Sequence, residues 1–330
     1  MSVPHCPHRG GFPARLLSLF AALHGSCSAL RTFPGTGVAP KHKYEWFKEP
    51  APDAEQSEVK VKATIPPPGH VAVLVTGVFY RLVLPPLVDS VVKPLTAAGY
   101  KVNVFMSLVK EPAAKTTWKP GAMSRFLGDP KLANLTDDSQ VEAKMRELLG
   151  DAGGNLAFFE LPEKSPDVRE LPDLNGPQNR ADRMDLYSPY TSEVGMNVLR
   201  RFQSLSDLWQ KARDVGDAGG FEHDWFMNLR EDLFWVLPFD LPTLERDRAV
   251  HHTSGGTVYN ILCVSYGGIN DKAVILDSKA AAWMCPEQYN SFYTSDAVSL
   301  KSRNAEQYAM QLAQLGNLSV VGVPLDFMFA

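Results

Sequence analysis

Hydrophobic residues between positions 70 and 110 fall into two continuous runs, separated by a stretch with helical character. Residues 71–76 form an apolar, mostly β-branched run that ends at Gly77, and residues 100–106 form the second run. Such runs are typical of strands that are covered on both faces of a parallel sheet. The pair Pro85-Pro86 is suited to open a helix between them, which Pro94 is expected to kink or shorten. This order predicts a βαβ unit with a right-handed crossover and with ligands at the carboxyl ends of the strands.

The same alternation continues through the middle of the chain. A helix is predicted from Asp137 or Asp138, either of which can cap it, to Gly150, and a strand is predicted over residues 155–160. A polar, turn-rich stretch then leads to a longer helix over residues 192–213. Its core-facing stripe consists of Val198, Phe202, Leu205, Trp209 and Ala212. We interpret this stripe, Trp209 included, as part of the core.

Three further elements are predicted in the second half. Residues 224–229 form an apolar strand, residues 304–315 a helix that Gly316 stops, and residues 318–323 a final strand. Together the elements predict one α/β domain over residues 70–330. It would be Rossmann-like, with a mostly parallel central sheet flanked by helices.

The first thirty residues have the pattern of a targeting segment. Arg9 and Arg15 precede an apolar run at residues 16–23, and small residues follow at 25–29, which is the order of a secretory signal peptide. An organelle transit peptide or an ordinary N-terminal arm are the alternatives. The run is too short to span a bilayer, which takes about 20 apolar residues. Residues 31–69 are rich in proline and charge and are predicted to be a stem or linker.

Composition narrows the classes of function. The 330 residues are 45% apolar, as in a globular protein, and carry a formal net charge of −4. No acid precedes Glu45, so the predicted domain is more acidic than the whole chain. Nucleic acid binding needs a basic face, and this balance therefore argues against a nucleic acid partner.

Cysteines and sequons bear on the compartment. Cys6 and Cys27 fall in the predicted targeting segment, which leaves Cys263 and Cys285 either to pair in an oxidising lumen or to stay buried and free. No cysteine or histidine spacing suits a zinc site. Sequons at Asn134 and Asn317 favour the secretory route, and Asn317 is expected at an accessible turn.

A charged trio follows the strand at residues 224–229. Arg230, Glu231 and Asp232 lie between two apolar runs, where a solvated turn is less expected, although a solvated turn is the alternative. Carboxylates are ligands that a hard divalent cation prefers, and a diphosphate would complete its shell. Neighbouring side chains of a strand point to opposite faces, so Asp232 is favoured over Glu231 as the metal ligand. The guanidinium of Arg230 suits a phosphate.

A second candidate site is the glycine-rich segment from Tyr266 to Asp271. Gly267 and Gly268 allow a tight turn and a close approach of the backbone to a ligand. An acid placed just beyond them, Asp271, can remove a proton from a sugar hydroxyl that attacks an anomeric carbon. The alternative is a hairpin turn capped by Asn270 and Asp271.

The order of these motifs resembles a poorly characterised family of glycosyltransferase-like proteins in unicellular eukaryotes. The resemblance covers roughly residues 70–330 and rests on the two N-terminal strands, the 200–209 helix, the segments 224–235 and 267–272, and residues 304–308. Such proteins look like the GT-A class of nucleotide-diphospho-sugar transferases. The glycine pair followed by an acid is also similar to the acceptor loop of β-1,4-galactosyltransferases.

The residues and the resemblance together suggest a role for each candidate residue. Thr76, Gly77, Arg81 and Arg230 would bind the donor nucleotide, and Asp232 with Glu231 would hold Mn²⁺ or Mg²⁺. Asp271 would be the catalytic base, and the acceptor would contact Tyr266, Gly267, Gly268 and Asn270. The chain departs from this class in having no Asp-x-Asp sequence.

The sequence thus predicts a luminal glycosyltransferase of the ER or Golgi, or a secreted one, that uses a nucleotide-sugar donor and a glycan or protein acceptor. The missing Asp-x-Asp motivates an alternative, a protein of the same fold that binds glycans or a partner without catalysis. A hydrolase that uses His251 and His252 is a weaker hypothesis, because a His pair after Val250 is more typical of a strand end.

Overall fold

The structure is a computed structural model that describes residues 69–110, 132, 135, 137–165, 192–251, 255–261, 267–294, 302, 304–323, 325 and 327–329. The predicted targeting segment and almost all of the predicted stem lie outside these residues. So do Cys263, Tyr266, His252 and Asn134. Within the part of the chain that the structure describes, no helix combines the length and the hydrophobicity needed to cross a membrane.

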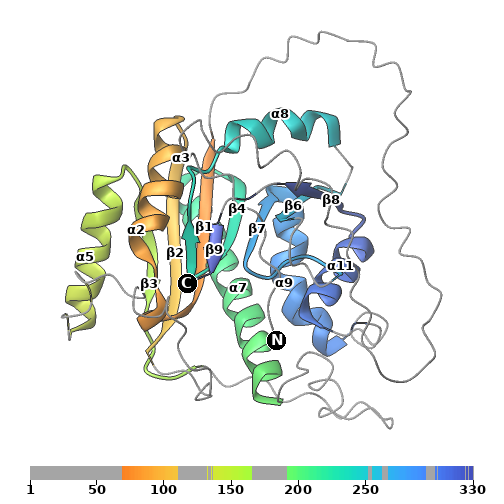
Figure 1. The fold of residues 1–330 in the computed structure, drawn as a ribbon, viewed down its shortest axis with the longest axis horizontal. Coiled ribbons are helices and arrows are strands. Elements are labelled where there is room, and N and C mark those ends of the chain that lie inside the picture. Colours follow the sequence, from red (N-terminus) through yellow and green to blue (C-terminus); the bar gives the residue numbers. More distant parts are fainter. Residues whose placement is uncertain are drawn as a thin grey trace, which may run out of the picture. The chain divides into compact units, whose positions relative to one another are not determined.

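A seven-stranded sheet forms the centre of the fold (Figure 1). Its spatial order is β3 (Asn155–Glu160), β2 (Lys101–Val109), β1 (His70–Val78), β4 (His223–Arg230), β7 (Ala273–Asp277), β6 (Thr257–Ile261) and β8 (Ser319–Val323). Only β7 runs antiparallel to its neighbours, and the other adjacent pairs are parallel. A separate antiparallel pair is made by β5 (Leu233–Trp235) and β9 (Phe327–Phe329). The predicted α/β fold with a mostly parallel sheet is confirmed.

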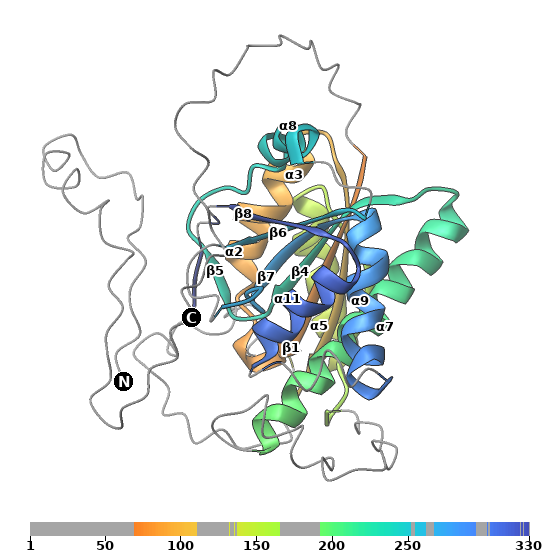
Figure 2. The same ribbon diagram turned by 90° about the vertical axis from the view of Figure 1, so that its right-hand side faces the viewer.

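Both faces of the sheet are covered by helices. Along β1, Val71, Val73 and Val75 face one core, and Ala72 and Leu74 face the other. The first core is closed by α2 (Leu84–Leu87), α3 (Lys93–Ala97), α5 (Asp138–Asp151) and α8 (Leu241–His251). The second is closed by α7 (Ser192–Gly219), α9 (Ser278–Thr294) and α11 (Ala305–Leu315). Figure 2 shows α9 and α11 toward the viewer. This double burial explains why the strand is apolar at every position from Val71 to Val75.

The helix between β1 and β2 bends where proline requires it. Leu84–Leu87 and Lys93–Ala97 are joined by a π-helical turn at Val88–Val92, which ends two residues before Pro94. Proline has no N–H, so the carbonyl of Ser90 loses its helical partner. That carbonyl instead accepts a hydrogen bond from the backbone N–H of Phe239 at 2.7 Å. The predicted distortion is confirmed, and it ties the segment after β5 to this helix.

Three expectations need correction or addition. The long helix continues to Gly219, beyond the predicted end at residue 213. His251 ends helix α8, so the prediction of a strand end there was wrong. The sequence analysis also missed β6, β7 and α9. By contrast, Asn317 has a φ of 53° in an exposed turn, as predicted, and the side chain of Asp137 caps α5 by accepting from the Ser139 N–H.

Candidate functional site

The candidate site lies at the carboxyl ends of β1 and β4, which are adjacent and parallel. Their register places Thr76 opposite Arg230. Backbone hydrogen bonds hold the segments after the two strands together. The N–H of Glu231 donates to the Thr76 carbonyl at 3.3 Å, and the N–H of Val83 donates to the Glu231 carbonyl at 2.9 Å. Ligands of open α/β sheets bind at this edge, and the sequence had predicted it for Thr76, Gly77, Arg81 and Arg230.

Two buried acids lie under two arginines here. The side chains of Glu231 and Asp232 are only 4% and 5% exposed, against 27% for Arg81 and 23% for Arg230. Arg81 contacts both acids, with its Nε 3.3 Å from the Glu231 carboxylate. Arg230 binds Asp232 in a bidentate contact, in which Nε donates to Oδ1 at 3.0 Å and Nη2 donates to Oδ2 at 2.7 Å.

The prediction that Glu231 and Asp232 point to opposite faces does not hold. Strand β4 ends at Arg230, and the next two residues form a turn. The strand pleat therefore no longer separates the two side chains, and both reach Arg81. Gly77 makes room for this arrangement: it has a φ of +149°, and a Cβ there would lie 1.9 Å from the Glu231 carboxylate.

Asp271 joins the same charged group from the turn before β7. Its carboxylate lies 3.0 Å from Nη1 of Arg201, 2.7 Å from Nζ of Lys272 and 3.8 Å from Nη1 of Arg230. Arg230 therefore connects Asp271 with Asp232, which are far apart in the sequence. Burial raises the pKa of Asp271, but the charges of Arg201, Arg230 and Lys272 outweigh it and hold this pKa below its usual range.

Arg201 on α7 is a member of the cluster that the sequence analysis missed. Besides its contact with Asp271, its Nε lies 3.4 Å from Oγ1 of Thr76. Burial lowers its pKa, and the charge of Asp271 opposes the shift. The sequence contained a signal for this residue, because position 201 follows Val198 by three residues and precedes Leu205 by four and so lies on the same face of the helix. A charged side chain on that apolar stripe needs a buried partner.

Glu306, in the first turn of α11, is a second acid near Asp271. Its backbone carbonyl accepts the Ile269 N–H at 3.0 Å, which fixes the glycine turn against the helix. Burial and then the negative charge of Asp271 raise the pKa of Glu306. The sequence analysis had considered an approach to the acceptor pocket but favoured a solvated helix acid. The side chain is half-buried, so this acid is partly withdrawn from water.

Tyr266 lies outside the described residues, and the other residues predicted to contact an acceptor have mainly structural contacts. A Cβ on Gly268 would lie 1.9 Å from the Glu306 carbonyl, so the close approach that this glycine permits is to α11. Asn270 is 1% exposed, and its Oδ1 accepts the Lys272 N–H at 2.8 Å. This matches the alternative of a capped turn. Gly267 is exposed, with a φ of +82°.

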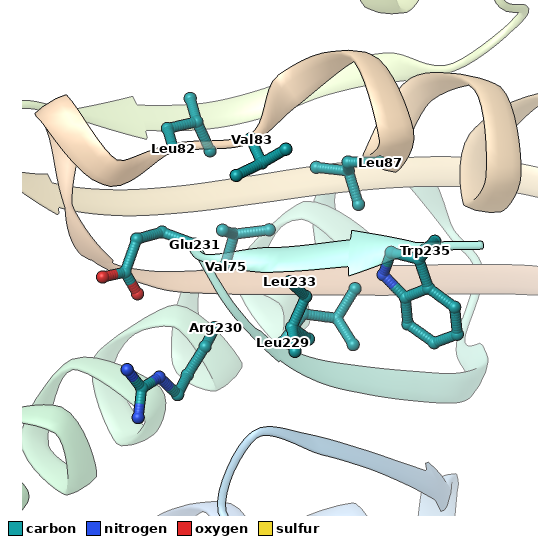
Figure 3. A pocket seen from close by; sticks show the side chains of 9 residues that line it. All are labelled: Val75, Leu82, Val83, Leu87, Leu229, Arg230, Glu231, Leu233 and Trp235. Carbon is teal, nitrogen blue, oxygen red and sulfur yellow. The ribbon is translucent and has the colours of Figure 1, made fainter. Parts of the chain in front are cut away.

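Two small cavities flank the charged group. The first runs from Glu231 and Arg230 to Trp235 between otherwise apolar walls (Figure 3), and its free space of about 10 Å³ is that of a packing gap. The second lies behind Asp271, between Arg201, Asn228 and Gln288, with about 20 Å³ of free space. Oε1 of Gln288 is buried there and has no hydrogen-bond partner among the described residues. Neither cavity has the volume of a nucleotide, so a ligand of that size would meet the charged group from outside.

The donor set does not fit a divalent cation as it stands. Among the described residues, no group of three His, Cys, Asp or Glu side chains is placed to hold a metal. Both oxygens of Asp232 already accept hydrogen bonds from guanidinium groups. The predicted metal role of Asp232 and Glu231 stays a prediction, and their contacts favour a different role, that of positioning arginines.

Comparison with known proteins gives similarity of fold alone. No protein-family model and no curated protein sequence matches this chain. Solved structures with a similar fold include a protein described as a nucleotide-diphospho-sugar transferase from Desulfovibrio desulfuricans G20, with 11% identity, a TM-score of 0.33, and coverage of 78% of this chain and 79% of that one. Mouse xyloside xylosyltransferase 1 in its apo form has 10% identity, a TM-score of 0.39, and coverage of 77% and 85%.

The glycosyltransferase GlyE of Streptococcus pneumoniae TIGR4 has 12% identity and a TM-score of 0.33. The similarity covers 76% of this chain but only 45% of GlyE, so this chain spans less than half of that protein. At such identities the likeness concerns the α/β architecture and transfers no activity. The function has to be argued from the site itself.

Proposed function

We propose that this protein transfers a sugar from a nucleotide-sugar donor to a glycan or protein acceptor. The observation that carries the proposal is the convergence of Arg81, Arg230 and Arg201 with Asp232 and Asp271 at the carboxyl edge of β1 and β4. Guanidinium groups suit the diphosphate of such a donor, because their planar N–H donors match phosphate oxygens. Thr76 and Gly77 would face the same part of the donor from the end of β1.

In the proposed reaction, the acceptor hydroxyl oxygen forms a bond to the anomeric carbon while the bond from that carbon to the diphosphate breaks. The nucleoside diphosphate leaves with the bonding electron pair, and the hydroxyl proton passes to a carboxylate. Asp271 is the proposed base, since its low pKa keeps it ionised at neutral pH. Its charge neighbours also make it a weak base, and Glu306, with its raised pKa, is the stronger one nearby.

A panel of sugar nucleotides incubated with the purified full chain tests the proposal. Release of nucleoside diphosphate in the presence of simple glycan acceptors is the expected result. Asp271→Asn should lower the rate by at least about 100-fold while donor affinity stays within a few-fold. Asp89→Asn, which changes a largely exposed acid on the neighbouring helix, is the matched control. Absence of binding and turnover with every donor at millimolar concentration would refute the proposal.

One observation favours the alternative of a binding protein without turnover. The carboxylate of Asp271 lies within 3.0 Å of both Arg201 and Lys272, and cations this close reduce its tendency to take a proton. In that case donors would bind, no product would form, and Asp271→Asn would change affinity only. The same two measurements, of binding and of product release, therefore separate the hypotheses.

The proposed place of action is the lumen of the secretory pathway, with an organelle reached by a transit peptide as the alternative. Asn317 of the sequon Asn317-Leu318-Ser319 lies in an exposed turn, which supports access for glycan addition. Expression in a eukaryotic host should give a band that shifts on treatment with a peptide glycosidase, and Asn317→Gln should reduce the shift. An unshifted protein found in another organelle would refute this placement.

A further inference from the structure

We infer that this site binds the diphosphate of its donor without a divalent cation, because Arg81 and Arg230 supply the positive charge and Glu231 with Asp232 hold them in place. The inference rests on the proposed function, since it concerns the same donor. It reverses the role that the sequence suggests for the two acids. They become positioning residues for guanidinium groups in place of metal ligands.

The depth of the side chains supports this assignment. Glu231 and Asp232 are 4% and 5% exposed and lie beneath arginines that are several times more exposed. A ligand that arrives at the edge of the sheet therefore meets guanidinium groups first. A metal at the same carboxylates would need a path through them.

Among the residues that the structure describes, the hydrogen bonds of Arg230 use only part of its donors. A guanidinium has five N–H donors in a rigid plane. Arg230 donates one N–H from Nε and one from Nη2 to Asp232, and its Nη1 lies 3.8 Å from the Asp271 carboxylate. Because the bidentate contact with Asp232 fixes the plane of the guanidinium, the remaining N–H groups are preorganised for a phosphate oxygen.

A cation would compete with this arrangement. Mg²⁺ binds oxygen ligands at about 2.0–2.1 Å, closer than any hydrogen bond allows. At Asp232 it would have to displace Arg81 or Arg230 from the same oxygens, and the released guanidinium would then face a second positive charge. The glycine at position 77 reinforces the existing contact, since it gives the Glu231 carboxylate room to lie against the backbone below Arg81.

Titration calorimetry of the full chain with UDP, GDP, CDP and ADP tests the inference, with each nucleotide measured in EDTA and again in manganese. We expect one of them to bind with dissociation constants that agree within about threefold in the two conditions. Arg81→Gln and Arg230→Gln should each weaken that binding at least tenfold in EDTA. Lys93→Gln, which removes a positive charge from an exposed pair with Asp89 on the neighbouring helix, should leave it unchanged.

The possible failures are distinguishable. Binding that appears only with manganese would overturn the inference and leave the proposed function standing. Binding in EDTA that neither arginine variant weakens would overturn it as well. If no nucleotide binds in either condition, the proposed function fails, and the inference falls with it. The comparison of EDTA with manganese uses the unmodified protein, so it decides the question even if an arginine variant does not fold.

Discussion

Removal of the Asp232 carboxylate is expected to weaken the fold itself. Asp232→Ala leaves Arg81 and Arg230 without the buried acid that both contact, and loss of one partner from a buried ion pair costs about 3–5 kcal/mol. Two features reduce this value. The arginines are about one quarter exposed, so water recovers part of their solvation, and Glu231 keeps its contact with Arg81. We therefore expect a loss of about 2–3 kcal/mol in the free energy of unfolding.

Urea denaturation followed by tryptophan fluorescence measures this loss. With a slope of about 3 kcal/mol per molar urea, as expected for a domain of this size, the midpoint should fall by about 0.7–1 M. Asp89→Ala is the control, because Asp89 is 60% exposed and forms a surface pair with Lys93, which stabilises by less than about 0.5 kcal/mol. If the two variants shift the midpoint equally, the argument that Asp232 is a buried partner of the arginines is refuted.

Three further perturbations test other parts of the site. Gly77→Ala places a Cβ against the Glu231 carboxylate at a φ of +149° and should lower the free energy of unfolding by about 2 kcal/mol. Gly150→Ala, on an open helix surface, is the control and should raise the free energy of unfolding by about 0.5–1 kcal/mol. Thermal unfolding measures both changes. The pKa of Glu306 is raised, so its ionised form destabilises the fold. Glu306→Gln should therefore stabilise the protein at pH 7. A gain in stability that persists well below the ordinary pKa of 4.5 would contradict this cause. The pKa of Asp271 is lowered in the folded protein, so its carboxylate stabilises the fold above the ordinary pKa of 3.8. This stabilisation is lost as the pH falls through the lowered pKa of the folded state. Asp271→Asn should therefore lower the melting temperature more at pH 7 than at pH 2.5.

Much of the fold was predictable because its elements are periodic within short windows. The continuous apolar runs at residues 71–76 and 100–106 gave β1 and β2, and Pro94 indicated the distorted helix between them. The elements that were missed carry weak local signals. Strands β6 and β7 have five residues each, too few to show a period, and α9 carries Pro286 in its interior, which argues against a helix locally. In the folded protein, β6 and β7 lie within the sheet and α9 packs in the core that covers it.

The sequence by itself determined which chemical groups stand at strand ends: a threonine and glycine after β1, an arginine and two acids after β4, and an aspartate before β7. The tertiary structure alone decided their partners. The parallel register of β1 with β4 brings Arg81 onto acids some 150 positions later, and α7 adds Arg201 from a third segment. Hydrophobic periodicity is a local property of the chain, whereas the charge environment of a carboxylate depends on residues that only packing brings near. For that reason a metal ligand could be proposed from the sequence, and an anchored pair of arginines became visible only in the folded protein.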